Sequence, residues 1–482
     1  MVRLSIKTMA KKRSVFKDKK EKWYRLDSSA DLYTMSLSRV TQSNFRATVE
    51  MQKKVDPIIL QQALELTYTR YPSFKVHLRK GLFRFYFEEN NNKPVVFPCS
   101  GIFMENMDFR KNKRFVIRVS YYENDIVVDY FHGLTDGTGA VEFLKTLLYS
   151  YLKLSGEKIL NTTNIKVPET DFDSEEEMED ATAKYFKDFP LNDKAVGSMT
   201  GKNSIYLKDK PLVRPGFGVI RGYVDASKIK DLAKKYDCSI TEYLAALALM
   251  SINSTFVKDG DKKNLAIMIP VNLRNIFPSQ TLHNFTTLVR CELDQHKVEP
   301  NMQAYVDVIK EDLRKGVADH ELLNKKLSIA ALMAKKIYLR LMPSLFKMIF
   351  IKVPKTPIVR PRQSLILSNL GIFKVSDDVG RHIKSVAFNV NVSSKTPINV
   401  GVMTHNGVAC ISFTSRIAST EFEREFFTRL VKEGVDVKIS SNNRIEADKQ
   451  ERSRKGRLNI KKEFLKEKRK QLIEKKNALK AK

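Results

Sequence analysis

The stretch YFHGLTDGTGAVEFL, residues 130–144, decides the fold of this chain. It contains His132 and, four residues later, Asp136 followed directly by glycine. Apolar residues alternate over 126–132, which predicts a strand with His132 on its apolar face. Apolar residues then recur at helical spacing over 140–151, which predicts a buried helix. The histidine is therefore expected at the exit of a strand, just before the N-terminus of a helix.

His132 has two interpretations at this point. An imidazole at the rim of an apolar strand titrates in the range in which a general base works. The alternative is a core histidine whose ring is satisfied by a backbone carbonyl. HxxxDG fixes only three of six positions and arises often by chance, but the glycines that follow His132 permit backbone shapes that suit a site. The context therefore favours a functional histidine.

The composition is that of a folded chain with charged ends. The chain has 482 residues, 42% of them hydrophobic, which suits one large or two ordinary domains. Four cysteines lie far apart without a CxxC pair, so we expect reduced thiols and neither a zinc site nor a disulfide framework. The N-terminus lacks the apolar core of a signal peptide, and no run of about 18 uncharged apolar residues occurs. We expect a cytoplasmic protein, with peripheral membrane contact left open.

The net charge of +30 is concentrated at the two ends. Residues 441–482 carry sixteen Lys and Arg against six Asp and Glu, and residues 1–25 carry ten against two. Solvated tails are the simplest interpretation. Contact of these ends with an anionic membrane surface or with nucleic acid stays open. The mixed apolar and basic stretch 331–355 either meets lipid or packs as an ordinary helix.

Strands and helices are mixed in both halves without a regular βα alternation. This pattern predicts an α+β protein of two side-by-side lobes rather than a doubly wound parallel sheet. We divide the chain into four parts: a basic extension (1–22), an N-terminal lobe with the HxxxDG motif that ends in an acidic linker (23–190), a C-terminal lobe (205–440), and a basic tail, helical or disordered (441–482). The acidic stretch 168–184 is expected at the surface.

The motif, its strand and its helix resemble the superfamily of acyltransferases and condensation domains built on the chloramphenicol-acetyltransferase fold. The alcohol O-acetyltransferase-like branch is the most similar. The signature of that superfamily is HHxxxDG or HxxxD, with the second histidine catalytic, and it maps onto His132. Phe131 stands in place of the first histidine, which argues against a peptide-synthetase condensation domain. The segments IPVNLR (269–274), NFTTLV (from Asn284) and SNLG (368–371) also resemble family elements.

The resemblance implies a fold and a set of roles. It implies two lobes, each a mixed sheet flanked by helices, with the active site in the cleft between them. His132 would be the general base, and Asp136 would pair with Arg274 in a structural role. Gly137 would permit close chain approach beside the histidine. Three further residues are candidates for stabilising the oxyanion or lining the substrate: Ser368, Asn369 and Asn284.

The function implied is transfer of an acyl group from a thioester to an alcohol or amine. Acyl-CoA is expected as a co-substrate, with no permanently bound cofactor and no metal, because the remaining histidines show no metal-ligand spacing. His283, beside Asn284, is expected at the surface, and the alternative is a position near the cleft. The acceptor is expected to be small or lipid-like, and the protein a monomer. The alternative is a non-catalytic binding protein on the same fold that uses its basic ends to dock an anionic membrane or nucleic acid.

Overall fold

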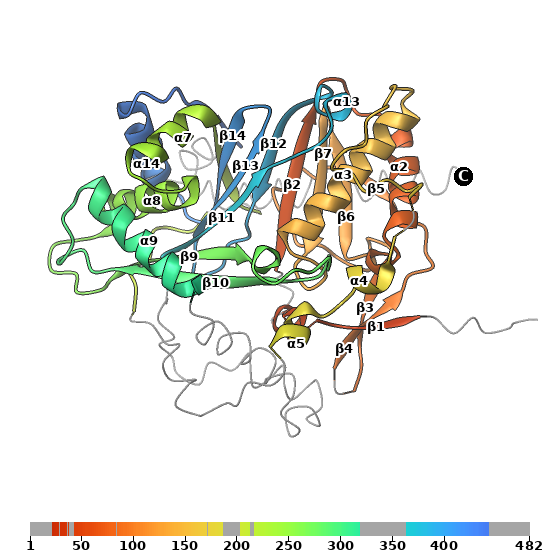
Figure 1. Cartoon of the computed structure of the whole chain (residues 1–482), viewed down its shortest axis with the longest axis horizontal. Coiled ribbons are helices and arrows are strands. Elements are labelled where there is room, and N and C mark those ends of the chain that lie inside the picture. The colour runs from red at the N-terminus through yellow and green to blue at the C-terminus, as the bar shows by residue number, and fades with distance from the viewer. Residues whose placement is uncertain are drawn as a thin grey trace, which may run out of the picture.

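The computed structural model describes residues 22–442 apart from 28, 36, 38–42, 83, 171, 187–202, 213–215 and 319–362. Figure 1 shows the arrangement of its elements. The basic extension before residue 22, the stretch 331–355 and the tail after residue 442 lie outside the described residues. The expectations for these three segments therefore stay predictions.

The N-terminal lobe is built on a five-stranded sheet with the order β12-β2-β7-β6-β5. Its strands are β2 (Asn44–Met51), β5 (Val96–Pro98), β6 (Ile117–Tyr122), β7 (Asp125–Phe131) and β12 (Ile383–Asn389). β5 runs parallel to β6, and the other neighbours are antiparallel. Helices α2 (Pro57–Arg70) and α3 (Gly137–Leu154) cover one face of this sheet (Figure 1).

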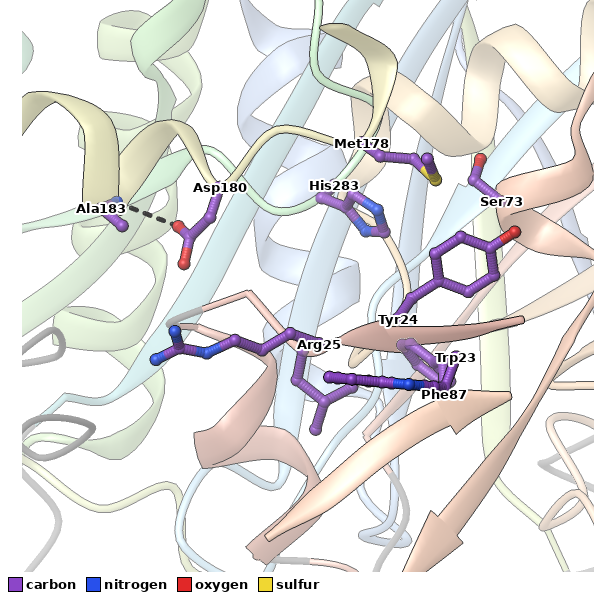
Figure 2. A pocket seen from close by; sticks show the side chains of 10 residues that line it. Trp23, Tyr24, Arg25, Ser73, Phe87, Met178, Asp180, Ala183 and His283 are labelled. Carbon is purple, nitrogen blue, oxygen red and sulfur yellow. Dashed lines mark hydrogen bonds between the residues drawn. The ribbon is translucent and has the colours of Figure 1, made fainter. Parts of the chain in front are cut away.

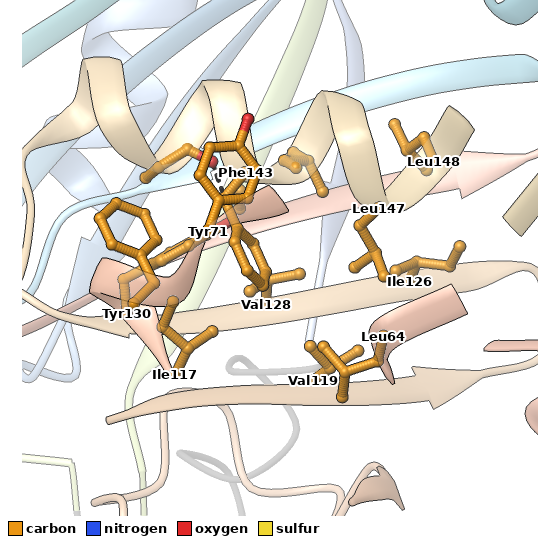
Figure 3. Packing of buried hydrophobic residues seen from close by; sticks show 14 of the residues in the cluster. Leu64, Tyr71, Ile117, Val119, Ile126, Val128, Tyr130, Phe143, Leu147 and Leu148 are labelled. Carbon is orange, nitrogen blue, oxygen red and sulfur yellow. Dashed lines mark hydrogen bonds between the residues drawn. The ribbon is translucent and has the colours of Figure 1, made fainter. Parts of the chain in front are cut away.

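The alternation predicted for the strand before His132 is present in β7. Its residues Val128 and Tyr130 are fully buried and pack against Phe143 and Leu147 of α3 (Figure 3). Asp129 points to the other face. The apolar core therefore lies between α2, α3 and the sheet, and it fixes the position of the loop that carries His132.

The C-terminal lobe holds a seven-stranded sheet in the order β10-β9-β11-β13-β14-β8-β15. Its strands are β8 (Gly218–Asp225), β9 (Leu265–Asn272), β10 (Thr286–Leu293), β11 (Leu365–Ile372), β13 (Ile398–His405), β14 (Val408–Ser415) and β15 (Lys438–Ser441). β11 runs parallel to both β9 and β13, so this sheet is mixed. Helices α7 (Ala226–Lys235), α8 (Ile240–Phe256), α9 (Met302–Ala318) and α14 (Glu421–Lys432) pack beside it (Figure 1).

One strand does not follow the linear division into lobes. β12 lies in the C-terminal part of the sequence but pairs with β2 at the edge of the N-terminal sheet, with Phe388 opposite Ala47. The apolar face of β12 is buried in the core of the N-terminal lobe through Val386 and Phe388. The chain thus crosses from one lobe to the other and back, which ties the two lobes together.

A third, smaller sheet in the order β1-β4-β3 lies below the N-terminal lobe in the view of Figure 1. It consists of β1 (Trp23–Arg25), β3 (Val76–Lys80) and β4 (Phe85–Glu89), and β1 leads into the short helix α1 (Ala30–Met35). The remaining short elements are η1 (Pro72–Phe74), η2 (Leu273–Asn275), α4 (Ser174–Glu177), α5 (Ala181–Tyr185) and α13 (Asp377–Gly380).

The acidic stretch 168–184 is only partly a surface segment, so that prediction was wrong for its centre. Glu177 is buried and forms ion pairs with Arg70 at 2.7 Å and with Lys166 at 2.6 Å. Glu179 accepts a hydrogen bond from the Ser279 hydroxyl at 2.5 Å. The acidic residues therefore attach this segment to α2 on one side and to the C-terminal lobe on the other.

The expected α+β class, with two lobes of mixed sheets flanked by helices, is confirmed. Within the described part of the chain, no helix is both long enough and apolar enough to cross a membrane.

Candidate active site

The site is built where β7 ends and α3 begins. β7 ends at Phe131, and Asp136 is the N-cap residue of α3. One carboxylate oxygen of Asp136, Oδ1, accepts hydrogen bonds from the backbone N–H groups of Thr138 at 3.0 Å and Gly139 at 3.3 Å. The aspartate therefore satisfies free N–H groups of the helix and holds the five-residue loop that starts with His132.

The second carboxylate oxygen of Asp136 reaches the other lobe. Arg274, from η2 directly after β9, donates from Nη1 to Asp136 Oδ2 at 2.8 Å. The backbone N–H of Phe285 donates to the same oxygen at 2.9 Å. Both side chains are buried, with 1% of Asp136 and 10% of Arg274 exposed. The pairing implied by the family resemblance is thus a buried, fully hydrogen-bonded ion pair between the lobes.

Further hydrogen bonds join the same two segments. The Thr135 hydroxyl donates to the carbonyl of Leu282 at 2.6 Å, and His283 Nδ1 donates to the carbonyl of Leu134 at 3.0 Å. A Cβ atom at Gly139 would overlap the Leu282 carbonyl oxygen. His283 is buried, so its expected surface position was wrong. The HxxxDG loop is therefore fixed to the segment that precedes β10.

His132 is partly buried and has contacts with two aromatic rings and at both nitrogens. Its Nδ1 lies 3.0 Å from Asn284 Oδ1, and its Nε2 lies 3.3 Å from the Tyr33 hydroxyl. The Tyr33 ring stacks on the imidazole, with 4.2 Å between ring centroids, and Phe45 meets it edge-on at 5.1 Å. The ring thus has a single well-defined orientation.

The hydrogen bonds of Asn284 define which nitrogen of His132 carries the proton. Its Nδ2 donates to Asp27 Oδ2 at 3.2 Å, so its Oδ1 faces the imidazole. An amide oxygen only accepts, so Nδ1 of His132 must carry the hydrogen and Nε2 holds a free electron pair. Burial lowers the pKa of His132, which keeps the ring neutral at pH 7. His132 is therefore in the state that a general base requires.

Comparison with known proteins bears on this arrangement. Residues 224–433, from the end of β8 to just past α14, match the family model of the alcohol acetyltransferases. The match includes Arg274 and Asn284 but not His132. No curated protein sequence matches the chain.

Solved structures share the whole architecture at low sequence identity. Polyketide synthase associated protein 5 from Mycobacterium tuberculosis is 13% identical, with a TM-score of 0.58 over 84% of this chain and 96% of that one. F. graminearum TRI101, complexed with coenzyme A and T-2 mycotoxin, is 11% identical, with a TM-score of 0.55 over 84% and 96%. TRI3 trichothecene 15-O-acetyltransferase from Fusarium sporotrichioides is 11% identical, with a TM-score of 0.53 over 85% and 94%.

The chain has the two-lobed fold of the acetyltransferases and condensation domains. The fold that the family resemblance implies is thereby confirmed. In this acetyltransferase fold the motif lies at the contact between the lobes, because its loop bonds to Arg274 and to residues 282–285.

The remaining sequence candidates lie on β11 and at the start of α3. The side chain of Leu370 lies against Gly137, where an added Cβ would meet the flexible end of that side chain. Asn369 donates to the Thr241 hydroxyl of α8 at 3.1 Å, on the opposite side of the strand. Since side chains alternate along a strand, the neighbouring Ser368 points away from Thr241. Among the described residues, neither Ser368 nor Asn369 bonds to His132.

Sequence reasoning missed two residues, Asp27 and Tyr33. Asp27 precedes two serines and caps α1, a pattern that the sequence could have revealed. Its bond to Asn284 joins residues 257 positions apart, for which a single sequence carries no signal. Tyr33 lies in α1, and no local pattern connects it with His132.

Two cavities lie near the site. The first, of about 360 Å³, is bounded by β1 and by His283 and Asp180, with Tyr24 and Trp23 along its apolar side (Figure 2). The second, of about 1090 Å³, lies between β2, β6 and β7 of one lobe and β8 and β15 of the other. His132 lines neither cavity. The first cavity adjoins the segments that carry Asp27 and Asn284.

Proposed function

We propose that this protein transfers an acyl group from an acyl thioester, acyl-CoA, to the hydroxyl or amine of an acceptor. His132 is the general base in this proposal. The observation that carries it is the hydrogen-bond chain from Asp27 through Asn284, which places the ring proton on Nδ1 of a neutral imidazole and leaves Nε2 as the nitrogen that accepts. Such a base contributes on the order of 10²–10⁴-fold to the rate.

The reaction uses this nitrogen twice. Nε2 removes the proton from the acceptor as its oxygen or nitrogen attacks the thioester carbonyl carbon. When the tetrahedral intermediate collapses, the carbon–sulfur bond breaks, and the imidazolium returns the proton to the thiolate. The products are the ester or amide and free thiol, and His132 is again neutral.

Asp136, Arg274 and Gly137 have structural roles in this proposal. The ion pair keeps the loop of His132 attached to the second lobe, and Gly137 allows β11 to approach α3. We assign the stabilisation of the oxyanion to Ser368 rather than to Asn369, because the side chain of Asn369 is engaged with Thr241. Asn284 is assigned to orienting the base rather than to contacting substrate.

The comparisons support the substrate classes. TRI101 is described in complex with coenzyme A and a mycotoxin, and TRI3 as a 15-O-acetyltransferase, so proteins of this fold take CoA and hydroxyl-bearing acceptors. The alternative, a non-catalytic binding protein, is not favoured, because it gives no reason for an imidazole held in the basic tautomer. Its basic ends lie outside the described residues.

The test is a screen of acyl-CoA donors of increasing chain length against mixtures of alcohols and amines. Free CoA and acylated products are measured by mass spectrometry. We expect release of CoA that depends on an acceptor, together with a product that carries the acyl group. Absence of acceptor-dependent release across all donors would overturn the proposed function.

A further inference from the structure

We propose that Asp27 is a positioning residue that selects the basic tautomer of His132 through Asn284. The inference rests on the proposed function for its consequence in catalysis. Its physical content, the choice of tautomer, is measured without any reaction. Asp27 lies in the segment between β1 and α1, far in sequence from both the histidine and the asparagine.

The two oxygens of Asp27 have different tasks. Oδ1 accepts from the backbone N–H groups of Ser29 and Ala30, each at 2.8 Å, and so caps α1. Oδ2 accepts from Asn284 Nδ2 at 3.2 Å. The side chain is buried, with the residue only 5% exposed. Because the two backbone donors occupy Oδ1, a change of protonation must act at Oδ2, the atom that faces Asn284.

This geometry fixes which atoms donate and which accept hydrogen bonds along Asp27, Asn284 and His132. An ionised Oδ2 only accepts, so it must meet the amide nitrogen of Asn284. The amide oxygen then faces His132 Nδ1, which must carry the hydrogen. If Asn284 turned over, its NH₂ group would face Nδ1, and the ring proton would move to Nε2. A ring with the proton on Nε2 cannot accept one from a substrate.

Asp27 also supports the other side of the ring. The helix that it caps carries Tyr33, whose ring stacks on His132 at 4.2 Å and whose hydroxyl meets Nε2. Burial raises the pKa of Tyr33, so its hydroxyl stays protonated and remains a donor. A donor at Nε2 favours the same tautomer as an acceptor at Nδ1. Two contacts of the imidazole, those with Asn284 and Tyr33, therefore depend on one carboxylate, while the backbone of His132 and of Thr135 also bonds to the ring.

The charges around Asp27 place its titration near neutral pH. Burial, and then the charge of Asp180 on α5, raise its pKa to about 7. His283 Nδ1 lies 4.0 Å from Oδ2, and Arg274 and Asp136 lie beyond it. Asp180 and His283 bound the 360 Å³ cavity from two sides (Figure 2). Below this pH Oδ2 is protonated and becomes a donor. Asn284 then turns over, so that its NH₂ group faces Nδ1 of His132.

The test exchanges the side chains of Asp27 and Asn284. In Asp27→Asn, the new oxygen keeps the cap of α1, but the new NH₂ group donates to Asn284 and reverses the chain. In the double variant Asp27→Asn with Asn284→Asp, the NH₂ group donates to a carboxylate that again accepts from Nδ1. The tautomer is read from the chemical shifts of the ring nitrogens in ¹⁵N-histidine-labelled protein, with His132→Ala used to assign the signals.

We expect Nδ1–H in the wild-type protein at pH 8, Nε2–H in Asp27→Asn, and Nδ1–H again in the exchanged double variant. Turnover should fall by on the order of 10²–10⁴-fold in Asp27→Asn, the contribution of a general base, and recover in the double variant. Nδ1–H in all three proteins would overturn the inference.

The wild-type protein alone provides a second measurement, which decides the matter if Asp27→Asn does not fold. Its His132 tautomer should shift from Nδ1–H towards Nε2–H as the Asp27 carboxyl takes up a proton, and a tautomer that stays constant while this carboxyl titrates would overturn the inference. A correct tautomer pattern without any acyl transfer would instead remove the proposed function and leave the role of Asp27 intact.

Discussion

Arg274 and Asp136 form a buried ion pair that joins the two lobes directly beside His132. The guanidinium donates to Asp136 Oδ2 at 2.8 Å and also to the carbonyls of Thr281 at 2.9 Å and His283 at 2.6 Å. One arginine thus binds the carboxylate that caps α3 and the backbone that carries Asn284. The base and the residue that orients it are held together by this one side chain.

Asp136→Asn should destabilise the protein by about 3–5 kcal/mol, because it leaves the charge of Arg274 buried without a partner. Unfolding in urea, followed by circular dichroism, measures this free energy. Asp56→Asn is the matched control, since Asp56 also caps a helix, through Ile58 and Ile59, but lies exposed. The control should change stability by less than about 0.5 kcal/mol. Equal small effects in both variants would contradict the role given to the ion pair.

The two glycines at the start of α3 should respond differently to alanine. At Gly139 the new Cβ meets a backbone carbonyl, that of Leu282, which the Thr135 hydroxyl already holds. We expect a loss of about 1–3 kcal/mol there. At Gly137 the new Cβ meets only the end of the Leu370 side chain, which can turn away. The gain in helix propensity, about 1 kcal/mol, offsets the cost of this contact. A lower melting temperature for Gly137→Ala than for Gly139→Ala would show that the lobes do not approach as closely as described.

Asp129 should make stability sensitive to acid. Burial alone would raise its pKa, but the guanidinium groups of Arg46 and Arg118 outweigh burial and lower it. A lowered carboxyl pKa adds stability above the ordinary value of about 3.9, and this stability is lost as pH falls through the lowered pKa. Asp129→Asn should therefore be less stable by about 3–5 kcal/mol at pH 7, and the difference should shrink below pH 4.

Urea unfolding at several pH values measures this difference. The exposed Asp259→Asn is the control and should follow the wild-type protein at every pH. A constant gap between Asp129→Asn and the wild-type protein down to pH 2 would mean that the carboxylate is not the source of the effect.

Much of the fold and part of the site could be predicted from the sequence, for local reasons. The alternation before His132, the helical spacing after it and the aspartate that caps α3 are short-range patterns. The family resemblance then linked Asp136 to Arg274 across 138 positions. The crossing of β12 into the first lobe could not be predicted, because its apolar alternation is the same whichever sheet it joins.

The rest of the site depends on contacts that leave no trace in one sequence. Tyr33 reaches His132, and Asp27 reaches Asn284, only because β1 and α1 fold back beneath the first lobe. His283 is buried and bonds to the Leu134 carbonyl. The residues next to His283 in the sequence do not predict this contact. Asn369 is turned towards Thr241 by the register of β11, so a motif that contains both Ser368 and Asn369 does not reveal which one faces the other lobe.

The most direct test of the account is the rate of acyl transfer by His132→Ala with the best donor and acceptor from the screen. The account predicts a fall in kcat of about 10²–10⁴-fold with an unchanged melting curve. His296→Ala, an exposed histidine bonded to the Asp261 carbonyl, should keep the wild-type rate. Wild-type turnover in folded His132→Ala would contradict the central claim that this imidazole is the base.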